Sequence, residues 1–393
     1  MKQLAEAMAA RGHRARVLSS AHASCEPEIV NGVEVFGAGA PNLYDGTDGD
    51  KKAAWRRLAW HAIDEYSAGS AVVARHIGDF APDIMNSHNI SGLTTSGWRG
   101  AYEAQVPIVH TLHDYYLLCP RTTRRRHDRN CERQCLGCRA LTLRRRPASD
   151  LLSGVISVSR HVLEVHRRAG LFSRVPNQWV INNAVPAPAA AAAPASAAGA
   201  PLRIGFIGRP DKDKGFWLLL EAFALLREDA ELTVAGRLKP DIVAAVAQHP
   251  KADRIRLLGF AAREDFYPAV DLVVVPSLWE DPYPTVILEA ASWGRPVLGA
   301  RRGGIPEAIR GTLWGWSFDP SSPRNLSDVV NRLAAYPEEL AEKTGGLAVG
   351  GRTVDELVDD YESAYRTVLS GRGSSVGASA AALSDIEIGA APA

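Results

Sequence analysis

The sequence has no long apolar run. No stretch of 18 or more consecutive apolar residues occurs among its 393 residues, which excludes a bilayer-spanning helix of ordinary length. The N-terminus also lacks the basic, apolar and small-residue regions of a secretory signal. We therefore expect a cytoplasmic protein, and peripheral contact with the inner face of a membrane remains an open alternative.

Net charge is nearly absent as well. The chain has 45 Lys and Arg against 44 Asp and Glu, a formal net charge of +1, so the molecule as a whole has no field that attracts polyanions. Hydrophobic residues make up 46% of the chain and charged residues 23%, which is typical of globular domains. Because 393 residues exceed what one core usually supports, we expect two domains with a cleft between them.

Strand and helix patterns alternate in the second half. Short runs rich in Val and Ile, such as 203–208 and 271–276, are separated by helix-length runs such as 216–226. This alternation predicts βαβ units around a parallel sheet, and therefore a Rossmann-like α/β domain. The first half is less regular but similar in kind, with strand candidates at 16–19, 84–87, 108–112 and 155–158.

Composition marks the domain boundaries. The segment 186–201 is almost wholly Ala and Pro, which is typical of a semi-rigid linker. We therefore expect an N-terminal domain at 1–185, a C-terminal domain at 202–352 and a C-terminal helix at 353–370. The tail 371–393 is rich in Gly, Ser and Ala and is expected to be disordered.

Two cations lie in a glycine-containing turn of the C-terminal domain. Gly208, Arg209, Lys214 and Gly215 lie between the apolar run 204–207 and a helix-length run. A strand, a turn with glycines and a helix N-terminus make a site for a diphosphate, because free amides and the helix dipole add to the two positive charges. The alternative is that both cations are solvated in an ordinary surface turn.

A pair of carboxylates flanks the start of a later helix. Asp281 lies in the loop at the carboxyl end of the strand 272–275, and Glu289 lies early in the helix, whose first residue we expect to be Pro284. Ligands of open α/β sheets bind in that crevice, where two carboxylates can accept hydrogen bonds from ribose and hexose hydroxyls. The alternative is that Asp281 caps the helix and Glu289 lies on the surface.

A third turn, 303–307, lies at the same edge of the sheet. Its glycines let the backbone approach a ligand, or merely permit a positive φ. The three turns 208–215, 281–289 and 303–307, in this order and spacing, resemble those of the retaining GT-B glycosyltransferases of family 4, the glycosyl transferases group 1. The resemblance covers about residues 1–370. It implies two Rossmann-like domains that face each other across a cleft.

The resemblance implies an activity. A hexosyl group would move from a nucleoside-diphosphate sugar, UDP- or GDP-linked, to a hydroxyl of a glycan or lipid-linked acceptor in polysaccharide or glycoconjugate biosynthesis. It would do so with retention at the anomeric carbon, and no cofactor is required. Asp281 stands where the family usually has glutamate and would bind the donor sugar, whereas Glu289 would bind the ribose.

The resemblance also assigns the remaining site residues. Arg209 and Lys214 match the cations that hold the donor diphosphate. The stretch from Val106 to Asp114 looks like a family strand that ends in His-Asp, so His113 is expected to contact the donor sugar across the cleft, although a lone histidine can equally be structural. We expect His113, Arg209, Lys214 and Asp281 to act in catalysis. The expected donor-binding set is Gly208, Arg209, Lys214, Asp281, Tyr283, Pro284, Thr285, Glu289, Gly303 and Gly304.

The N-terminal domain is expected to open with a helix. The segment 2–11 is amphipathic and ends at Gly12, a helix-stop signal, and a strand follows at once. A doubly wound domain normally begins with a strand, and family members carry a Gly-rich loop after it. We therefore expect this domain to lack its first strand. This motivates the alternative of a nucleotide-sugar-binding pseudoenzyme or assembly subunit.

Four of the five cysteines cluster in the first half. Cys119, Cys131, Cys135 and Cys138 lie within twenty residues, and four thiolates with short spacings can close a tetrahedral zinc site. A structural metal is one interpretation, and free thiols or a facultative disulfide are the others. A metal-clustered, arginine-rich binding protein on an inherited scaffold is a further rival function.

The same loop, 119–146, is rich in arginine. Its positive charge could receive an anionic acceptor, lie on an acidic membrane surface or simply be solvated. Nucleic-acid binding is not expected, because few aromatic residues interleave with the arginines and no recognised binding motif occurs. The ten arginines are Arg121, Arg124, Arg125, Arg126, Arg129, Arg133, Arg139, Arg144, Arg145 and Arg146.

Overall fold

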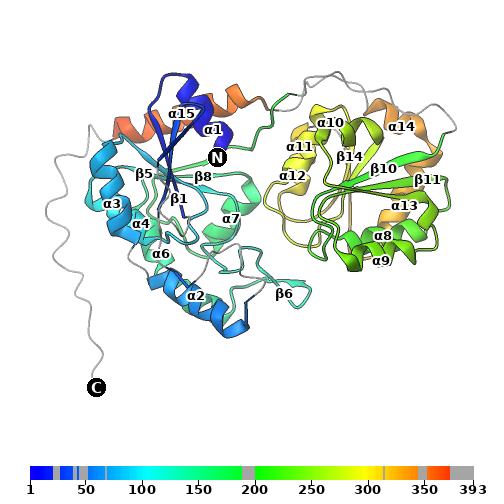
Figure 1. Ribbon diagram of the computed structural model, residues 1–393, viewed down its shortest axis with the longest axis horizontal. Coiled ribbons are helices and arrows are strands. Elements are labelled where there is room, and N and C mark those ends of the chain that lie inside the picture. The colour runs from blue at the N-terminus through cyan, green and yellow to red at the C-terminus, as the bar shows by residue number, and fades with distance from the viewer. Residues whose placement is uncertain are drawn as a thin grey trace.

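The computed structural model shows two α/β bodies side by side (Figure 1). It describes residues 1–20, 27–38, 42–43, 52–66, 69–187, 200–312, 315–343 and 352–371. Most of the linker expected at 186–201, and the tail from residue 372, lie outside the described residues. Within the described ranges, none of the helices is long and apolar enough to cross a membrane.

The N-terminal domain is built on a four-stranded parallel sheet with the order β4-β5-β8-β9. A second sheet has the order β1-β3-β2, in which β3 pairs parallel with β1 and antiparallel with β2. The strands are β1 (Ala15–Ser19), β2 (Glu28–Val30), β3 (Val33–Gly37), β4 (Met85–Ser87), β5 (Ile108–Leu112), β8 (Gly154–Ser157) and β9 (Asn177–Val180). The four strands expected from the sequence in this half are confirmed, each to within a residue at either end.

Seven helices of the described chain belong to this domain, and the first of them precedes β1. They are α1 (Lys2–Ala10), α2 (Ala54–Tyr66), α3 (Gly69–Phe80), α4 (Ser96–Glu103), α5 (Leu136–Leu141), α6 (Arg145–Ala148) and α7 (Arg160–Arg168). The short hairpin β6 (Arg125–Arg126) and β7 (Arg129–Asn130) lies in the arginine-rich loop. All five residues of β5 are buried, because this strand has a neighbouring strand on each side and apolar side chains pack over it.

The C-terminal domain is built on six parallel strands with the order β12-β11-β10-β13-β14-β15. The strands are β10 (Leu202–Ile207), β11 (Ala230–Ala235), β12 (Ile255–Gly259), β13 (Leu272–Val275), β14 (Val297–Ala300) and β15 (Gly315–Phe318). This is the doubly wound order of a Rossmann-like sheet, so the predicted fold class is confirmed for this half. Successive strands are added on one side of β10 up to β12 and on its other side from β13 onward. Ligands of such sheets bind outside the carboxyl ends of the strands at this switch point.

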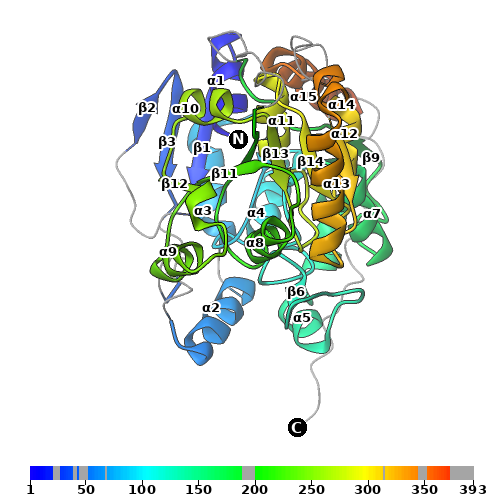
Figure 2. The same ribbon diagram turned by 90° about the vertical axis from the view of Figure 1, so that its right-hand side faces the viewer.

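Helices surround this second sheet (Figures 1 and 2). They are α8 (Phe216–Ala224), α9 (Pro240–Ala247), α10 (Arg263–Phe266), α11 (Thr285–Ser292), α12 (Ile305–Thr312), α13 (Pro323–Ala335) and α14 (Pro337–Glu342). A mainly aliphatic core with several phenylalanines lies between the sheet and helices α8, α9 and α13. The sheet therefore forms the rigid base on which the loops at its carboxyl edge rest.

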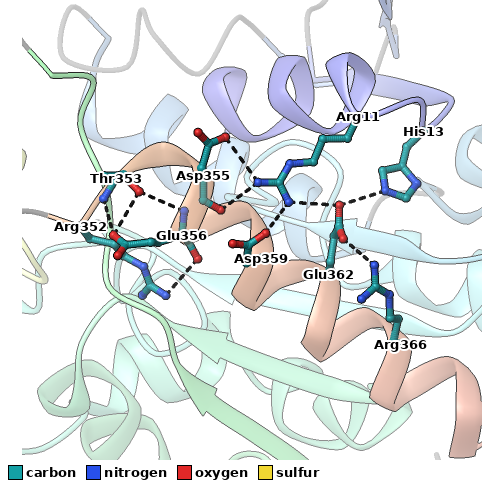
Figure 3. Close-up of polar contacts among 9 residues, drawn as sticks. All are labelled: Arg11, His13, Arg352, Thr353, Asp355, Glu356, Asp359, Glu362 and Arg366. Atoms are coloured by element: carbon teal, nitrogen blue, oxygen red, sulfur yellow. Dashed lines mark hydrogen bonds and ion pairs between the residues drawn. The ribbon is translucent and has the colours of Figure 1, made fainter.

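The last described helix, α15 (Val354–Ser370), returns to the N-terminal domain and packs on α1. It begins with a capping box, in which Thr353 and Glu356 exchange side-chain and backbone hydrogen bonds (Figure 3). Arg11, just after α1, contacts Asp355, Asp359 and Glu362 on one exposed face of α15. The opposite face is buried against the strands β5 and β8. This burial contributes more than the exposed ion pairs do.

We predict that the buried face of α15 fixes this packing. Tyr361 is 3% exposed within the cluster of apolar side chains that joins α15 to the N-terminal domain. Tyr361→Ala should lower the free energy of unfolding by about 3–5 kcal/mol, the usual cost of deleting a buried aromatic ring. Tyr361→Phe, which keeps the ring, is the matched control and should cost less than about 1 kcal/mol. Urea denaturation of the three proteins measures both, and equal stabilities would contradict the packing role.

Candidate active site

The two loops at the switch point hold each other in place. The loop after β10 meets the loop after β13, where the Leu278 N–H donates to the Asp213 carbonyl at 2.8 Å. Gly215 has a φ of +74°, and a Cβ there would lie 1.8 Å from the Pro276 carbonyl oxygen. Only glycine fits this position, because it tolerates both the left-handed backbone and the close approach. The predicted turn therefore has a structural requirement for its second glycine.

Lys214 and Asp281 form an ion pair between these loops. The Lys214 Nζ lies 2.5 Å from an Asp281 carboxylate oxygen, and the Asp281 side chain is 6% exposed. The Lys214 N–H donates to the Asp211 carboxylate at 2.8 Å, which orients the turn. The capping alternative for Asp281 is wrong, because the residue before α11 is Pro284 and no side chain caps this helix. Pro284 is thus the N-cap residue and not the first residue of the helix.

Glu289 is buried inside the domain. It is 8% exposed, and its carboxylate accepts a hydrogen bond from the Tyr267 hydroxyl at 2.9 Å and pairs with Arg263 at 2.8 Å. The alternative of a surface glutamate is therefore wrong. Burial raises the pKa of the Tyr267 phenol, so it remains a hydrogen-bond donor. No local pattern points to Tyr267 or Arg263, because both precede β13 in the chain whereas Glu289 follows it.

Arg209 lies in solvent rather than in the pair formed by Lys214 and Asp281. Its side chain is 73% exposed and pairs with the Asp211 carboxylate at 3.7 Å. Gly208 has a φ of +144°, and its carbonyl approaches Gly236 too closely for a side chain there. The solvated-cation alternative describes Arg209 in this structure but not Lys214. The expected roles of Gly208 and Arg209 toward a donor stay predictions.

The third turn supports the loop that carries Asp281. A Cβ at Gly303 or Gly304 would come within 2.3 Å and 1.9 Å of the carbonyl oxygens of Asp281 and Pro282 respectively. The Gly304 N–H donates to the Asp281 carbonyl at 2.7 Å. Gly303 and Gly304 are therefore needed because two segments of this chain approach each other closely. Contact of these glycines with a donor stays a prediction.

His113 follows β5 and faces the C-terminal domain across a cavity. The cavity has a volume of about 220 Å³, and His113 and Thr285 line it from opposite domains together with Asn183. Thr285 is exposed at the start of α11, whereas Tyr283 and Pro284 before it are buried. The His113 Nε2 lies 2.8 Å from the His88 Nδ1, and burial lowers the pKa of His113 to about 4. His113 is therefore neutral at physiological pH.

Side chains of the arginine-rich loop bridge the two domains. The Arg125 guanidinium donates to the Asp213 carboxylate at 2.8 Å and to the Leu278 carbonyl at 3.0 Å. Arg124 lies 3.3 Å from the Glu280 carboxylate, and the Tyr115 hydroxyl donates to the Glu280 carbonyl at 2.9 Å. These contacts hold the backbone on both sides of the pair formed by Lys214 and Asp281. No pattern in the sequence indicates this role.

A further contact joins the third turn to the N-terminal domain. Both Glu307 carboxylate oxygens accept from the Arg160 N–H, at 2.9 and 3.0 Å, at the first residue of α7. Carboxylates are stabilised at helix N-termini, where the amides are free and the helix dipole is positive. The α12 helix of one domain thus supplies an acceptor for a helix of the other.

The arginine-rich loop is only partly solvated. Arg145 and Glu65 form an ion pair in which both side chains are fully buried, and Arg125 is 8% exposed. The interpretation of a wholly solvated loop is therefore wrong for Arg124, Arg125 and Arg145. The seven exposed arginines are Arg121, Arg126, Arg129, Arg133, Arg139, Arg144 and Arg146.

The four clustered cysteines are free thiols. Cys119 is buried, Cys131 and Cys138 are half-buried, and Cys135 is exposed. The Sγ atoms of Cys119 and Cys138 lie 3.9 Å apart. Among the described residues, no three or more His, Cys, Asp or Glu side chains are already grouped as a metal site.

Comparisons with known proteins agree with this arrangement. A family model described as "Glycosyl transferases group 1" matches residues 201–336, and one described as "Glycosyl transferase 4-like domain" matches residues 1–177. An "Uncharacterized 42.6 kDa protein in cps region" of Klebsiella pneumoniae is 28% identical over 309 residues, which cover 78% of this chain and 81% of that protein.

Two more similarities bear on the site. Lipopolysaccharide 1,2-N-acetylglucosaminetransferase of Salmonella typhimurium is 29% identical over 180 residues, 40% of this chain and less than half, 46%, of that enzyme. The structure of Anabaena Alr3699/HepE in complex with UDP and glucose has a TM-score of 0.62 at 19% identity, and the match covers 93% of this chain and 94% of that one. At this identity the likeness establishes the fold, which is the two-domain GT-B fold.

The buried histidine gives a testable pH dependence. The folded pKa of His113, about 4, lies below its ordinary value of about 6.5, so the unfolded chain binds the extra proton between these values. The contribution of His113 to stability is therefore complete above about pH 6.5 and is lost as the pH falls toward 4. Burial raises the pKa of the neighbouring Asp114 to about 6, which acts in the opposite direction, so the test compares two proteins.

In the His113→Gln variant, the free energy of unfolding should fall less steeply between pH 6.5 and 4 than in the wild type. The difference between the two slopes corresponds to at most one bound proton per molecule. Urea denaturation at several pH values measures both slopes. Identical slopes would show that His113 is not held neutral by burial.

Proposed function

Because the chain belongs to the glycosyl transferases of group 1 and is a glycosyltransferase of GT-B fold, we propose that it moves a hexosyl group from a nucleoside-diphosphate sugar to an acceptor hydroxyl with retention. The observation that carries this proposal is the position of Lys214, Asp281 and Glu289 at the switch point of the sheet. His113 and Thr285 both line the cavity described above. Ligands of doubly wound sheets bind at such a point.

Each carboxylate has a role in the proposal. The Glu289 carboxylate is held by Tyr267 and Arg263, which leaves it oriented to accept from ribose hydroxyls. Asp281 would accept from the donor sugar once Lys214 turns from it to the diphosphate. The free amides at the start of α11 lie between the two carboxylates and favour a phosphate or sugar oxygen.

The transfer step needs charge stabilisation rather than an enzyme nucleophile. The bond between the anomeric carbon and the diphosphate oxygen breaks, the acceptor oxygen attacks from the same face, and the acceptor proton leaves with the diphosphate. Negative charge develops on the leaving diphosphate, and Lys214 and Arg209 would stabilise it. Neutral His113 would accept or donate a hydrogen bond to the sugar.

The relatives suggest the substrates. The Anabaena structure is titled as a complex with UDP and glucose, so we propose a UDP-sugar in preference to a GDP-sugar. The Salmonella relative is named as a lipopolysaccharide transferase, which supports an acceptor in glycoconjugate or polysaccharide biosynthesis, a glycan or a lipid-linked sugar.

A donor-binding and turnover experiment tests this function. A thermal-shift screen of UDP- and GDP-sugars should show stabilisation of the wild type, and Glu289→Ala should weaken binding at least about tenfold, because it removes a charged hydrogen-bond acceptor. Lys214→Ala should lower kcat/KM by about 100-fold to 1000-fold, the usual cost of losing a group that stabilises developing charge. Release of nucleoside diphosphate measures turnover, and proton NMR of the product measures retention.

Two neighbouring residues serve as controls. Lys212→Ala removes an exposed cation from the same turn, and Glu264→Ala removes an exposed carboxylate beside Arg263. Both should behave as the wild type. No stabilisation by any nucleotide sugar would refute the proposed donor class. Binding without turnover in any acceptor pool would instead favour the donor-binding pseudoenzyme.

We also propose that the exposed part of the arginine-rich loop lies on an acidic membrane surface. Exposed arginines surround α5, and the apolar side chains of Leu136 and Leu143 are 81% and 67% exposed. Helix α2 contacts α5 at the same end of the molecule (Figure 2). It exposes the side chains of Trp55 (68%) and Leu58 (57%). Arginines with apolar and aromatic side chains between them fit the interface of an anionic bilayer, where lipid-linked acceptors reside.

Vesicle sedimentation tests this surface. The protein should bind vesicles that contain phosphatidylglycerol but not pure phosphatidylcholine, and salt should weaken the binding. Each arginine near such a surface contributes about 1 kcal/mol, so Arg133→Glu with Arg139→Glu should lower the affinity at least about tenfold. Arg227→Glu with Arg310→Glu, a matched pair of exposed arginines in the other domain, is the control. Equal losses in the two double variants would contradict this surface.

A further inference from the structure

The arginine-rich loop has no apolar core of its own. From residue 121 to residue 141 no hydrophobic side chain is buried, and the helix α5 has no buried residue. The strands β6 and β7 have two residues each, which is too short to be stable by pairing alone. A segment that buries so little apolar surface needs another source of order, such as a disulfide or a metal.

The same loop holds a strained backbone. Thr122, Arg124, His127 and Asp128 have φ values of 63°, 50°, 48° and 62°, in the left-handed region that non-glycine residues seldom adopt. They are four of the nine such residues in the described chain. His127 and Asp128 form the two-residue turn of the hairpin β6–β7, where positive φ is usual. Thr122 and Arg124 lie outside this turn, where such a conformation costs about 1–3 kcal/mol each and needs support from the surroundings.

The four thiols are the side chains placed to do this. The Sγ atoms of Cys119 and Cys138 are 3.9 Å apart, close to the about 3.8 Å between two sulfurs of a tetrahedral site with zinc–sulfur bonds of about 2.3 Å. The Cys138 N–H points to the Cys135 Sγ at 3.4 Å, so the turn from Cys135 to Cys138 presents both sulfurs on one side. Cys131 follows β7, and its N–H donates to the Arg124 carbonyl at 2.7 Å.

We propose that Cys119, Cys131, Cys135 and Cys138 bind one zinc ion that replaces the missing core of this loop. The thiols come from the segment before the hairpin, the end of the hairpin and the start of α5, so a single ion would join all three. Among the described residues, no three potential ligands already lie together as a metal site. Zinc binding must therefore draw the more exposed Cys131 and Cys135 inward. A disulfide between Cys119 and Cys138 would not connect the end of the hairpin, at Cys131, to the rest of the loop.

Zinc would act on the domain interface through this loop. The hairpin carries Arg125, and Arg124 precedes it; their side chains reach Asp213 and Glu280, which are the chain neighbours of Lys214 and Asp281. An ordered loop fixes these guanidinium groups, whereas a loop without metal releases them. The metal is structural in this proposal, because it lies outside the cavity and contributes no group to the transfer.

Metal analysis of the full-length protein tests the proposal. Protein purified under reducing conditions should contain about one zinc per chain by plasma mass spectrometry. Cobalt substitution should give the thiolate charge-transfer and visible bands of a tetrahedral site. Cys131→Ser and Cys135→Ser, which alter the more exposed ligands, should lose most of the zinc. Cys25→Ser, the fifth cysteine in the sequence, is the matched control and should keep it.

The outcomes separate the alternatives. Absence of zinc from the reduced wild type, or full zinc content in both Cys131→Ser and Cys135→Ser, would overturn the proposal. A disulfide between Cys119 and Cys138 in the protein without zinc, detected by mass spectrometry of alkylated peptides, would also overturn it. These measurements do not depend on glycosyl transfer.

Discussion

The site depends on the parallel pairing of β10 with β13 in the centre of the C-terminal sheet. The two strands lead into loops on opposite sides of the switch point, so the chain cannot fill the crevice between their carboxyl ends. Lys214 comes from one loop and Asp281 from the other, and their ion pair links the two loops. Gly215 allows these two loops to touch, and Gly304 allows the third turn to touch the loop with Asp281, because a side chain at either position would collide with a carbonyl oxygen.

The N-terminal domain meets the C-terminal domain through both polar and apolar contacts. Val158 and Val185 pack in one buried cluster with Tyr283 and Ile305 of the C-terminal domain. Arg125, Tyr115 and the backbone of Arg160 each bond to a loop at the carboxyl edge of the other sheet. Helix α15 adds an apolar contact, since it follows the C-terminal domain in the chain but packs its buried face on the N-terminal sheet. Polar contacts can be exchanged for water at small cost, whereas the apolar face of α15 cannot. The buried face of α15 is therefore a stronger connection to the N-terminal sheet than any single exposed polar contact.

The arginine-rich loop shows how one segment can serve two surfaces. Arg125 faces the C-terminal domain and is buried, whereas Arg133 and Arg139 face solvent beside an exposed Leu136. Burial of a guanidinium is tolerated only where carboxylates and carbonyls satisfy it, as Asp213 and the Leu278 carbonyl do for Arg125. Arg133 and Arg139 have no such requirement, because water hydrates them. A count of arginines could not separate the two groups.

Local patterns in the sequence predict the α/β class, five of the six strands of the C-terminal sheet and three of the four strands of the main N-terminal sheet. They also predict the turn that holds Lys214 and the loop and helix that hold Asp281 and Glu289. The patterns are short runs of Val and Ile, glycines at turns and carboxylates at a fixed spacing. They do not reveal that Asp281 pairs with Lys214, that Tyr267 and Arg263 hold Glu289, or that Arg209 lies in solvent. Those contacts arise in the tertiary structure, because the partners lie on different segments that the order of strands in the sheet brings together.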